Sequence, residues 1–444
     1  MQAAQNDLVR HSFRDDPLMW LMRAARSGPL AVIDPTSPVL TRDPAAAGCL
    51  VVFSAPLVRV VLQDLNAFRM PLSAAVRDGL PDALVNLNSG VFSMGGALHR
   101  ERQQVMASLL GVRNAQAHVR AISTVVEPAA AALGDGGEVD VLDWARRVAG
   151  AAAERLVLGD AGVGAAWFVQ RYFDLRRRHS AAPTPQLRAA LLAAGADLDG
   201  VLRERIRAVS VSPESGGVLG QLLHSGRDWL QPPTEDEMVA HANILMASSS
   251  EPIATSMSWV LLALAQRPDV TTRLRHIVAG ASGGDVAPAI EEVVSESLRL
   301  APPNAVMVRV TTRAVRLAGR DVPAGTEVAL SPFVEHRNPQ VFPDPDRFRP
   351  ARWQTAHPTP FQFLPFGAGA RACLGRWIAR QTVGRTVTAV LKSSVPVLPR
   401  DTFVDWRMDV TLAPFGDPAI RFTTEAPDHP SGQLLGPGRL LIGF

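Results

Sequence analysis

The sequence predicts a mainly α fold with small β-sheets, and three observations lead to that class. Helical periodicity covers most of the first half, a long apolar segment over residues 234–266 opens on a capping box, and short alternating runs surround Gly319 and Gly325. With 47% hydrophobic and 20% charged residues, the 444-residue chain has enough apolar material for a large core. We therefore expect one large domain or two intimate ones, and we exclude a mostly disordered chain.

The first half is mainly helix. An amphipathic helix over residues 16–25 precedes an apolar strand over 50–53, which is bounded by Gly48 and Pro56. A loop rich in Pro, Asn, Ser and Gly runs to Gly96. The remaining segments have the 3.6-residue periodicity of helices: 57–67, 98–111, 114–133, 139–158 and 163–178.

The second half opens on the central helix. Thr234 is placed to cap the amide of Glu237 and to receive its side chain, and Pro268 closes the segment. At 1.5 Å per residue this helix would be about 50 Å long. Beyond it we expect a helix over 287–300, strands over 306–312 and 326–330, an irregular meander over 335–353, and a last helix over 374–392.

We expect an N-terminal segment over residues 1–15, one domain over 16–426 and a flexible tail over 427–444. The N-terminus lacks the apolar core of a signal peptide, and no apolar run reaches the roughly 18–20 residues of a membrane span. A net charge of +3 does not argue for nucleic acid, and Cys49 and Cys373 are spaced for neither a zinc site nor a disulfide framework. These features predict a cytoplasmic protein without membrane insertion, for which we favour a monomer.

The segment from Phe366 to Gly375 has the strongest chemical signal in the chain. Its glycines allow the backbone to turn sharply around Cys373, which stands just before an apolar helix. The N-terminal dipole of such a helix favours a thiolate over a thiol. The alternative is a buried structural cysteine beside a Gly-rich turn.

This loop resembles the cysteine loop of the cytochrome P-450 superfamily, the haem-thiolate monooxygenases. The shared positions are Phe366, Gly367, Gly369, Arg371, Cys373 and Gly375. The resemblance implies that Cys373 is the axial ligand of the haem iron, that Phe366 packs against the sulfur, and that Arg371 meets a haem propionate. It extends over residues 16–426 and implies the triangular, helix-rich haem domain of that family, with haem b (iron protoporphyrin IX) as cofactor.

Glu296 and Arg299 lie three residues apart on a predicted helix, so they share a face and can form an ion pair. Together with the meander they resemble the family's Glu-x-x-Arg helix and Phe-x-Pro-x-Arg segment. The resemblance implies that Arg352 completes a structural ion network of three residues. Arg309, on the first strand after that helix, matches the family's propionate-binding arginine, and a surface arginine is the alternative.

His99 and Arg102 lie where the family has a helix bearing His or Trp and, four residues later, Arg. In this chain the fourth place is Gln103 and the arginine stands at the third. Both spacings keep the pair on one helical face, so a propionate contact is predicted without deciding which residue makes it. A solvated charge run is the alternative.

The central helix departs from the family pattern at residues 248–252, where the run SSSEP replaces Ala-Gly-x-acid-Thr. The acid is kept as Glu251, but Pro252 has neither a hydroxyl nor an N–H and frees the carbonyl of Ser248. We assign catalytic roles here: protons pass through Glu251 with water, through a hydroxyl such as Ser248 or Thr255, or through the substrate. A carboxylate in an apolar pocket takes a raised pKa or meets a cation, which suits an amine-bearing substrate. The alternative is a helix kink.

Three functions remain open from the sequence. The first is a monooxygenase of a small, largely apolar, biosynthetic organic intermediate that uses O2 and electrons from a ferredoxin and its reductase. The second is a peroxide-dependent or non-hydroxylating haem-thiolate enzyme that cyclises or couples its substrate. The third is a haem sensor or carrier without turnover.

The resemblance also implies where partners bind. The pocket segments would be the loop 82–96, the helices around 165–200, the stretch 303–308 and the turn 413–416. We expect the ferredoxin to dock around Cys373 on a basic patch, the members of which would be Arg376, Arg380, Arg102 and Arg113.

Overall fold

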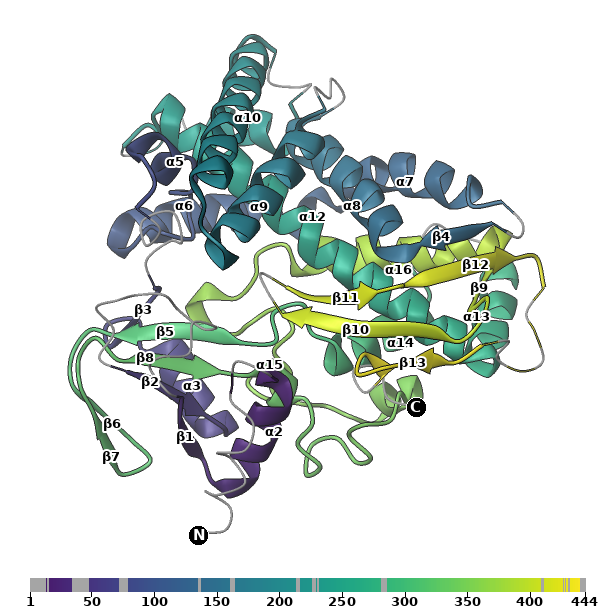
Figure 1. The fold of residues 1–444 in the computed structure, drawn as a ribbon. Helices are drawn as coiled ribbons and strands as arrows, with labels where there is room; N and C mark the ends of the chain where they lie inside the picture. Colours follow the sequence, from purple (N-terminus) through teal and green to yellow (C-terminus); the bar gives the residue numbers. More distant parts are fainter. Residues whose placement is uncertain are drawn as a thin grey trace. The chain divides into compact units, whose positions relative to one another are not determined.

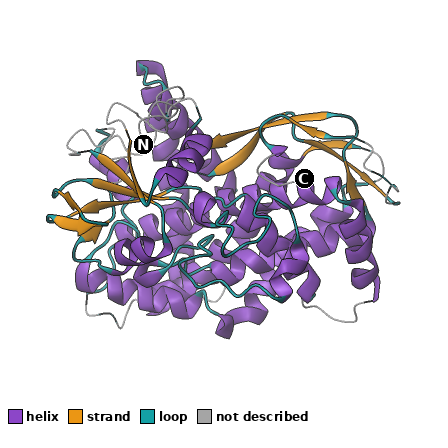
Figure 2. Cartoon of the chain, turned by 90° about the horizontal axis from the view of Figure 1, so that it is seen from below, coloured by secondary structure: helices purple, strands orange, loops and turns teal. Residues whose placement is uncertain are grey.

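The computed structural model describes residues 13, 16–33, 48–71, 79–134, 137–159, 164–212, 216–225, 229, 231–280, 286–408, 411–425, 427, 429 and 432–439. Helices dominate and the strands form small sheets (Figure 2), which confirms the predicted fold class. The described residues form two compact units. The first is built from the ranges 1–77 and 295–373, and the second from 78–294 and 374–439.

The first unit contains a five-stranded sheet (Figure 1). Its strands, in spatial order, are β1 (Leu30–Ile33), β2 (Cys49–Val52), β8 (Glu327–Leu330), β5 (Met307–Thr311) and β3 (Phe68–Arg69). Only β2 and β8 are parallel to each other. Strands β2 and β8 are buried along their whole length, including Glu327 at the start of β8.

The remaining elements of the first unit are short. They are α2 (Pro17–Ser27), α3 (Ala55–Gln63), the hairpin β6 (Val315–Leu317) and β7 (Arg320–Val322), α15 (Pro332–Glu335), and the 3-10 turns η4 (Pro350–Gln354) and η5 (Gly369–Arg371). Side chains of α3 and of the sheet share one hydrophobic core, to which Leu364 and Ala368 of the cysteine loop also belong. The core therefore anchors that loop directly.

The second unit is mostly helical. Its helices are α5 (Asp82–Leu87), α6 (Gly96–Leu109), α7 (Ala115–Ala131), α8 (Val141–Leu158), α9 (Ala165–Ala181), α10 (Pro185–Val211), α11 (Gly217–Ser225), α12 (Glu235–Gln266), α13 (Pro268–Gly280) and α16 (Arg376–Ser393), joined by the 3-10 turn η1 (Val112–Asn114). The helix α14 (Pro288–Leu300) begins in this unit and ends in the first. Two three-stranded sheets complete it, β4 (Glu138–Asp140) with β12 (Ala419–Thr423) and β9 (Val395–Val397), and β11 (Leu412–Gly416) with β10 (Thr402–Met408) and β13 (Leu434–Leu435).

Helix α12 is the central element of the second unit and packs extensively against α8 (Figure 1). The hydroxyl of Thr234 accepts a hydrogen bond from the amide of Glu237 at 3.1 Å, as the capping box predicts. The helix continues without a break through Pro252. Its C-terminal half is held by Trp259, which is fully buried and donates to the carbonyl of Leu412 at 2.8 Å.

The C-terminal segment, predicted to be a flexible tail, contains a short strand in its described part. β13 pairs in parallel with β10, and Leu434 is buried. The side chain of Gln266 donates to the carbonyl of Gly432 at 3.1 Å and accepts from the amide of Leu434 at 3.2 Å. Long-range pairing with α12 and β10 therefore orders a stretch whose composition is typical of a tail.

Among the helices that the structure describes, none combines the length and the apolar character needed to cross a membrane.

Candidate active site

The cysteine loop is a tight turn in the first unit. The amide of Cys373 donates to the carbonyl of Phe366 at 2.8 Å, and the cysteine side chain is exposed. Gly369 has a φ of +72° and lies so close to α3 that a Cβ there would be 2.7 Å from the carbonyl oxygen of Leu62. Only glycine fits this position, so the backbone holds the sulfur at the end of a rigid turn.

Two arginines of the same unit, Arg309 and Arg371, lie near enough to repel each other. Arg309 on β5 is 6% exposed, its Nη1 donates to the carbonyl of Val308, and its buried Nε has no partner among the described residues. Burial, and then repulsion from Arg371, lowers the pKa of Arg309 to about 10. A buried guanidinium is costly unless an anion meets it, so this arrangement is suited to an anionic group.

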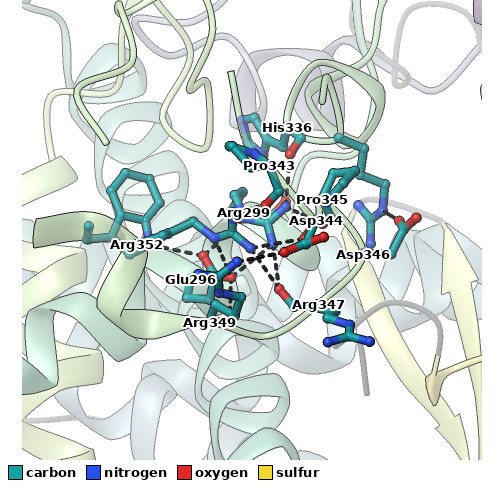
Figure 3. Close-up of polar contacts among 12 residues, drawn as sticks. Glu296, Arg299, His336, Pro343, Asp344, Pro345, Asp346, Arg347, Arg349 and Arg352 are labelled. Atoms are coloured by element: carbon teal, nitrogen blue, oxygen red, sulfur yellow. Dashed lines mark hydrogen bonds and ion pairs between the residues drawn. The ribbon is translucent and has the colours of Figure 1, made fainter. Parts of the chain in front are cut away.

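Glu296, Arg299 and Arg352 are brought together in one buried network (Figure 3). Arg299 donates to both carboxylate oxygens of Glu296, at 2.9 and 3.0 Å, and Arg352 donates to Oε1 at 2.9 Å. The amide of Arg349 adds a bond of 2.8 Å to Oε1, and the indole of Trp353 adds one of 3.1 Å to Oε2. Every lone pair that the carboxylate offers is engaged, so the charge is buried without an unpaired oxygen.

The same network holds the meander through backbone carbonyls. Arg299 donates to the carbonyls of His336, Pro345 and Arg347, and Arg352 donates to those of Pro343, Asp344 and Arg347. His336 is fully buried and bridges Arg299 and Leu364, accepting from the amide of Leu364 at 2.7 Å. Burial lowers the pKa of His336 to about 3, so the imidazole is neutral and free to accept. His336 thus connects the network to the segment of chain that leads into the cysteine loop.

In the second unit, α12 has a short accessible window. Between Met238 and Ala265 the helix is buried except at Ile244 and at residues 247–252, of which Ser248 is exposed. The window coincides with the run in which the sequence departs from the family pattern.

Glu251, in this window, meets a cation of the protein itself. Arg146 on α8 donates from Nε to Oε2 at 3.0 Å and from Nη2 to Oε1 at 2.6 Å. Burial lowers the pKa of Arg146, but the bonds to Glu251 outweigh it and raise the pKa above its ordinary value. The expected alternatives were a raised acid pKa or a cation, and Arg146 supplies the cation. The inference of an amine-bearing substrate therefore loses its basis.

The hydroxyls proposed as substitutes for the missing threonine bond mainly to their own helix. Ser248 donates to the carbonyl of Ile244 at 2.6 Å, and Thr255 donates to the carbonyl of Pro252 at 3.1 Å. Ser256, which the sequence did not single out, also donates to the carbonyl of Pro252, at 2.7 Å. Thr255 is fully buried, so of the two predicted hydroxyls only Ser248 lies in the accessible window.

Arg102 does not have the surroundings expected of a propionate ligand. It is 1% exposed and donates to Glu237 at 2.7 Å, to Glu101 at 2.6 Å and to the carbonyl of Gln231 at 2.7 Å. Its guanidinium also stacks over Trp229 at 4.0 Å. Because acids of its own unit take up its donors, the prediction of a propionate contact is corrected for Arg102, and His99, buried on the same helix, stays the candidate.

The predicted basic patch has fewer available arginines than expected, because acids of the same unit pair with some of its members. Arg102 is buried, and Arg380 forms an ion pair with Glu291 in which the shortest contact is 2.5 Å. Arg376 and Arg113 are exposed. Two of the four arginines therefore have acid partners within their own unit, which weakens the surface as an acceptor for an acidic partner.

Sequence reasoning missed Arg146, Trp353 and His336. Arg146 lies 105 residues before Glu251, so no local spacing relates the two. Trp353 and His336 stand in the meander that carries the family resemblance, next to Arg352 and Arg337, and a search for donors to Glu296 would have included the indole N–H. For Arg146 the chain offers no signal beyond its place on the amphipathic helix 139–158.

Residues 219–400 match the family model described as Cytochrome P450. Over 171 residues the chain is 30% identical to Cytochrome P450 3A19 of Capra hircus aegagrus, covering 36% of this chain and 78% of that protein. Over 194 residues it is 34% identical to cyclooctat-9-en-7-ol 5-monooxygenase of Streptomyces melanosporofaciens, covering 41% of this chain and 42% of that protein. The chain spans between about a third and two fifths of the length of several curated relatives that it matches, among them the 25-hydroxyvitamin D-1 alpha hydroxylases of Mus musculus and Homo sapiens.

A solved structure shares the fold over nearly the whole chain. The crystal structure of the cytochrome P450DA heme domain superposes with a TM-score of 0.78 at 18% identity, covering 93% of this chain and 94% of that one. The residues of the first unit fit haem: Cys373 offers an exposed thiol on a fixed turn, and Arg309 and Arg371 offer cations to carboxylates. The Nε of Arg309 is buried and has no partner among the described residues, so it could donate to a carboxylate.

Proposed function

Because the chain belongs to the cytochrome P450 family, with haem as its cofactor, we propose that it is a haem-thiolate monooxygenase. Its substrate is a small, largely apolar organic intermediate, and its oxidant is O2 with electrons from a ferredoxin and its reductase. Two relatives from Streptomyces melanosporofaciens, named cyclooctat-9-en-7-ol 5-monooxygenase and cyclooctatin synthase, support a biosynthetic substrate.

The residues of the first unit bind and orient the cofactor in this proposal. Cys373 supplies the thiolate that ligates the iron, Arg309 and Arg371 neutralise the propionates, and the Glu296 network keeps the loop in place. When bound, haem supplies the oxidising power that the side chains lack. The single observation that carries the proposal is the exposed Cys373 on its glycine turn, in the same unit as the buried guanidinium of Arg309, whose Nε has no partner among the described residues.

The residues of the α12 window handle protons. Arg146 donates to both oxygens of Glu251, which fixes the orientation of the carboxylate, and 31% of the Glu251 side chain is still exposed. Such a carboxylate can pass a proton through water, and Ser248 can relay one from the same window. Since Pro252 has no hydroxyl, proton delivery depends on how the substrate orders water against Glu251.

The peroxide-dependent or non-hydroxylating alternative rests on one observation. Pro252 removes the usual hydroxyl, and the nearby hydroxyls of Thr255 and Ser256 are both occupied by the carbonyl of Pro252. Product formation with hydrogen peroxide alone, at a rate equal to that with ferredoxin, its reductase and NADPH, would favour this alternative over the monooxygenase.

A spectrum tests the central claim. The reduced protein under carbon monoxide should show the red-shifted Soret band of a thiolate-ligated haem, and Cys373→Ala should lose it. Cys49→Ala is the matched control, because Cys49 is buried and burial, then Glu327, raises its pKa to about 12, so it is no thiolate ligand. Retention of the band in Cys373→Ala would contradict the assignment. A protein that has the band but turns over no substrate, with either oxidant, would be a sensor or carrier.

A further inference from the structure

Residues 432–439, which we call the strap, are held by the side chain of one glutamine. Gln266 is the last residue of α12, and its side-chain amide donates to the carbonyl of Gly432 at 3.1 Å and accepts from the amide of Leu434 at 3.2 Å. A group that donates to one carbonyl and accepts from the N–H two residues further on bonds as a neighbouring parallel strand does. The end of α12 therefore binds the backbone of the strap specifically.

The strap also pairs with β10, as Figure 1 shows for β13. The amide of Thr402 donates to the carbonyl of Gln433 at 2.8 Å, and the amide of Gly438 donates to the carbonyl of Val404 at 2.9 Å. On its other side β10 pairs with β11, and in the described part of the chain only the strap pairs with the remaining edge. Because an unpaired strand edge accepts other strands, the strap closes a surface that would otherwise bind one.

Two glycines allow the strap to lie this close to the sheet. A Cβ at Gly438 would be 2.6 Å from the carbonyl oxygen of Val404, and a Cβ at Gly432 would be 2.1 Å from the carbonyl oxygen of Arg400. Both obstacles are backbone atoms, which cannot turn aside as the end of a side chain can. Leu434, between the two glycines, is 2% exposed. The strap therefore fits its edge through small residues at the close approaches and a buried leucine between them.

We propose that the edge of β10 and Gln266 form a docking site for the strap, and that this site binds the strap of a second copy of this chain when its own strap cannot dock. The hydrogen bonds described above join the strap to residues 266 and 402–404, and none of them involves the connecting residues 424–431. The same bonds are therefore available from a second copy, as in the exchange of an identical element between protomers.

The short connection explains why the chain's own strap is the usual occupant. Eight residues, 424–431, join the end of β12 to the strap. A short linker gives the tethered segment an effective concentration on the order of millimolar, which a second copy does not reach at ordinary protein concentrations. Exchange between copies thus requires a weakened strap in one of them.

Gly438→Val tests the site, because it disables the strap and leaves the edge unchanged. In the full-length variant the amides of β10, followed by hydrogen–deuterium exchange and mass spectrometry, should exchange roughly tenfold faster than in wild type. A synthetic peptide with the sequence of residues 432–439, added at about 1 mM to match the effective concentration of the tethered strap, should restore exchange to within about twofold of wild type. The same peptide carrying Gly438→Val should not.

Gly137→Val is the matched control. Gly137 precedes β4 in the same unit, and a Cβ there would have no neighbouring atom within 4 Å, so exchange of β10 should stay as in wild type. Unchanged exchange in Gly438→Val would overturn the inference. Faster exchange that the wild-type peptide does not reverse would also overturn it, because the substitution would then disturb the sheet itself.

Gln266→Ala damages the site instead of the strap and introduces no clash. It removes both bonds from α12, so the amides of β10 should exchange several-fold faster than in wild type. The peptide should not reverse this change, since the missing group belongs to the site. Full restoration by the peptide would exclude Gln266 from the docking site and contradict the inference.

A mixture of the two variants tests the second copy as the partner. Gly438→Val has an intact site and a defective strap, whereas Gln266→Ala has an intact strap and a defective site. In an equimolar mixture, the strap of the second should dock on the site of the first and give a species of twice the mass, absent from each variant alone, by size exclusion with light scattering. A mixture that shows only the two separate profiles would overturn the second copy as the partner. None of these measurements uses haem, so they are independent of the proposed function.

Discussion

Glu296 and Glu251 are both helix carboxylates held by a bidentate arginine, yet their surroundings differ in every other respect. The side chain of Glu296 is fully buried and accepts from Arg299, from Arg352, from the indole of Trp353 and from a backbone amide. Glu251 is 31% exposed and is held by Arg146 of another helix. The first carboxylate has no lone pair left for a ligand, whereas the second keeps an accessible edge.

The difference separates a structural charge from a functional one. A buried carboxylate with all its bonds inside the protein stabilises a single conformation, and removal of any partner leaves an uncompensated charge. Substitution of a partly exposed carboxylate lowers the free energy of unfolding less. Such a carboxylate can also exchange protons with water. Substitutions at the two sites should therefore affect different measurements.

The largest effect is expected in the Glu296 network. Arg299→Ala leaves Glu296 buried without its main partner, which costs on the order of 3–5 kcal/mol, a large part of the stability of a typical domain. Little soluble holoprotein should be recovered, as judged by haem content per protein. Arg349→Ala is the matched control, because its side chain bonds to Asp344 at the surface and its loss should cost under about 1 kcal/mol. A normal yield of Arg299→Ala holoprotein would contradict the burial of the network.

Glu335 extends the comparison to a carboxylate whose pKa is set by burial alone. Burial raises it from 4.5 to about 7, so the folded state binds the proton more tightly than the unfolded state does. This stabilisation is fully present below pH 4.5 and is lost as the pH rises through about 7. The change amounts to about 3 kcal/mol in the free energy of unfolding.

Glu335→Gln should abolish that part of the pH dependence, so that denaturant midpoints at pH 5 and pH 8 lie closer together than in wild type. Glu127→Gln, at an exposed position on α7, is the control and should leave the wild-type difference intact. Equal pH slopes for wild type and Glu335→Gln would show that the carboxylate is solvated.

The smallest change in stability, with a selective change in chemistry, is expected at Glu251. Glu251→Gln should unfold within about 1 kcal/mol of wild type, because the pair is partly exposed. The same change should lower product formed per electron consumed by at least about tenfold, since a proton-handling group is lost. Arg146→Gln should have a similar effect on coupling, because it releases the same carboxylate.

Pro252→Thr completes this test by restoring a hydroxyl at the position. It should alter the product distribution or the share of electrons lost to peroxide, and leave the haem spectrum unchanged. If wild type, Glu251→Gln and Pro252→Thr couple equally well and give the same product, the dipeptide is only a local feature of the helix.

Much of the fold was predictable because its signals are local. The periodic helices before residue 181 and the central helix agree with the structure to within a few residues, apart from the helix predicted over 57–67, which lies at Ala55–Gln63. The strands after residue 400 escaped prediction, since β10, β11 and β13 gain their order from pairing rather than from a clear alternation. The described part of the tail follows the same rule, because Gln266 supplies its bonds from a distant helix.

The sequence by itself determined the turn around Cys373 and the pairing of Glu296 with Arg299. The signals for both are local, because glycine conformations and helical spacing leave few alternatives, although the close approach of Gly369 to Leu62 is visible only in the tertiary structure. Only the tertiary structure decided the partner of Glu251 and the fate of Arg102, each of which bonds to a residue more than a hundred positions away. No local rule orders such pairs, because any of the chain's many arginines satisfies an acid equally well until packing brings one of them within reach.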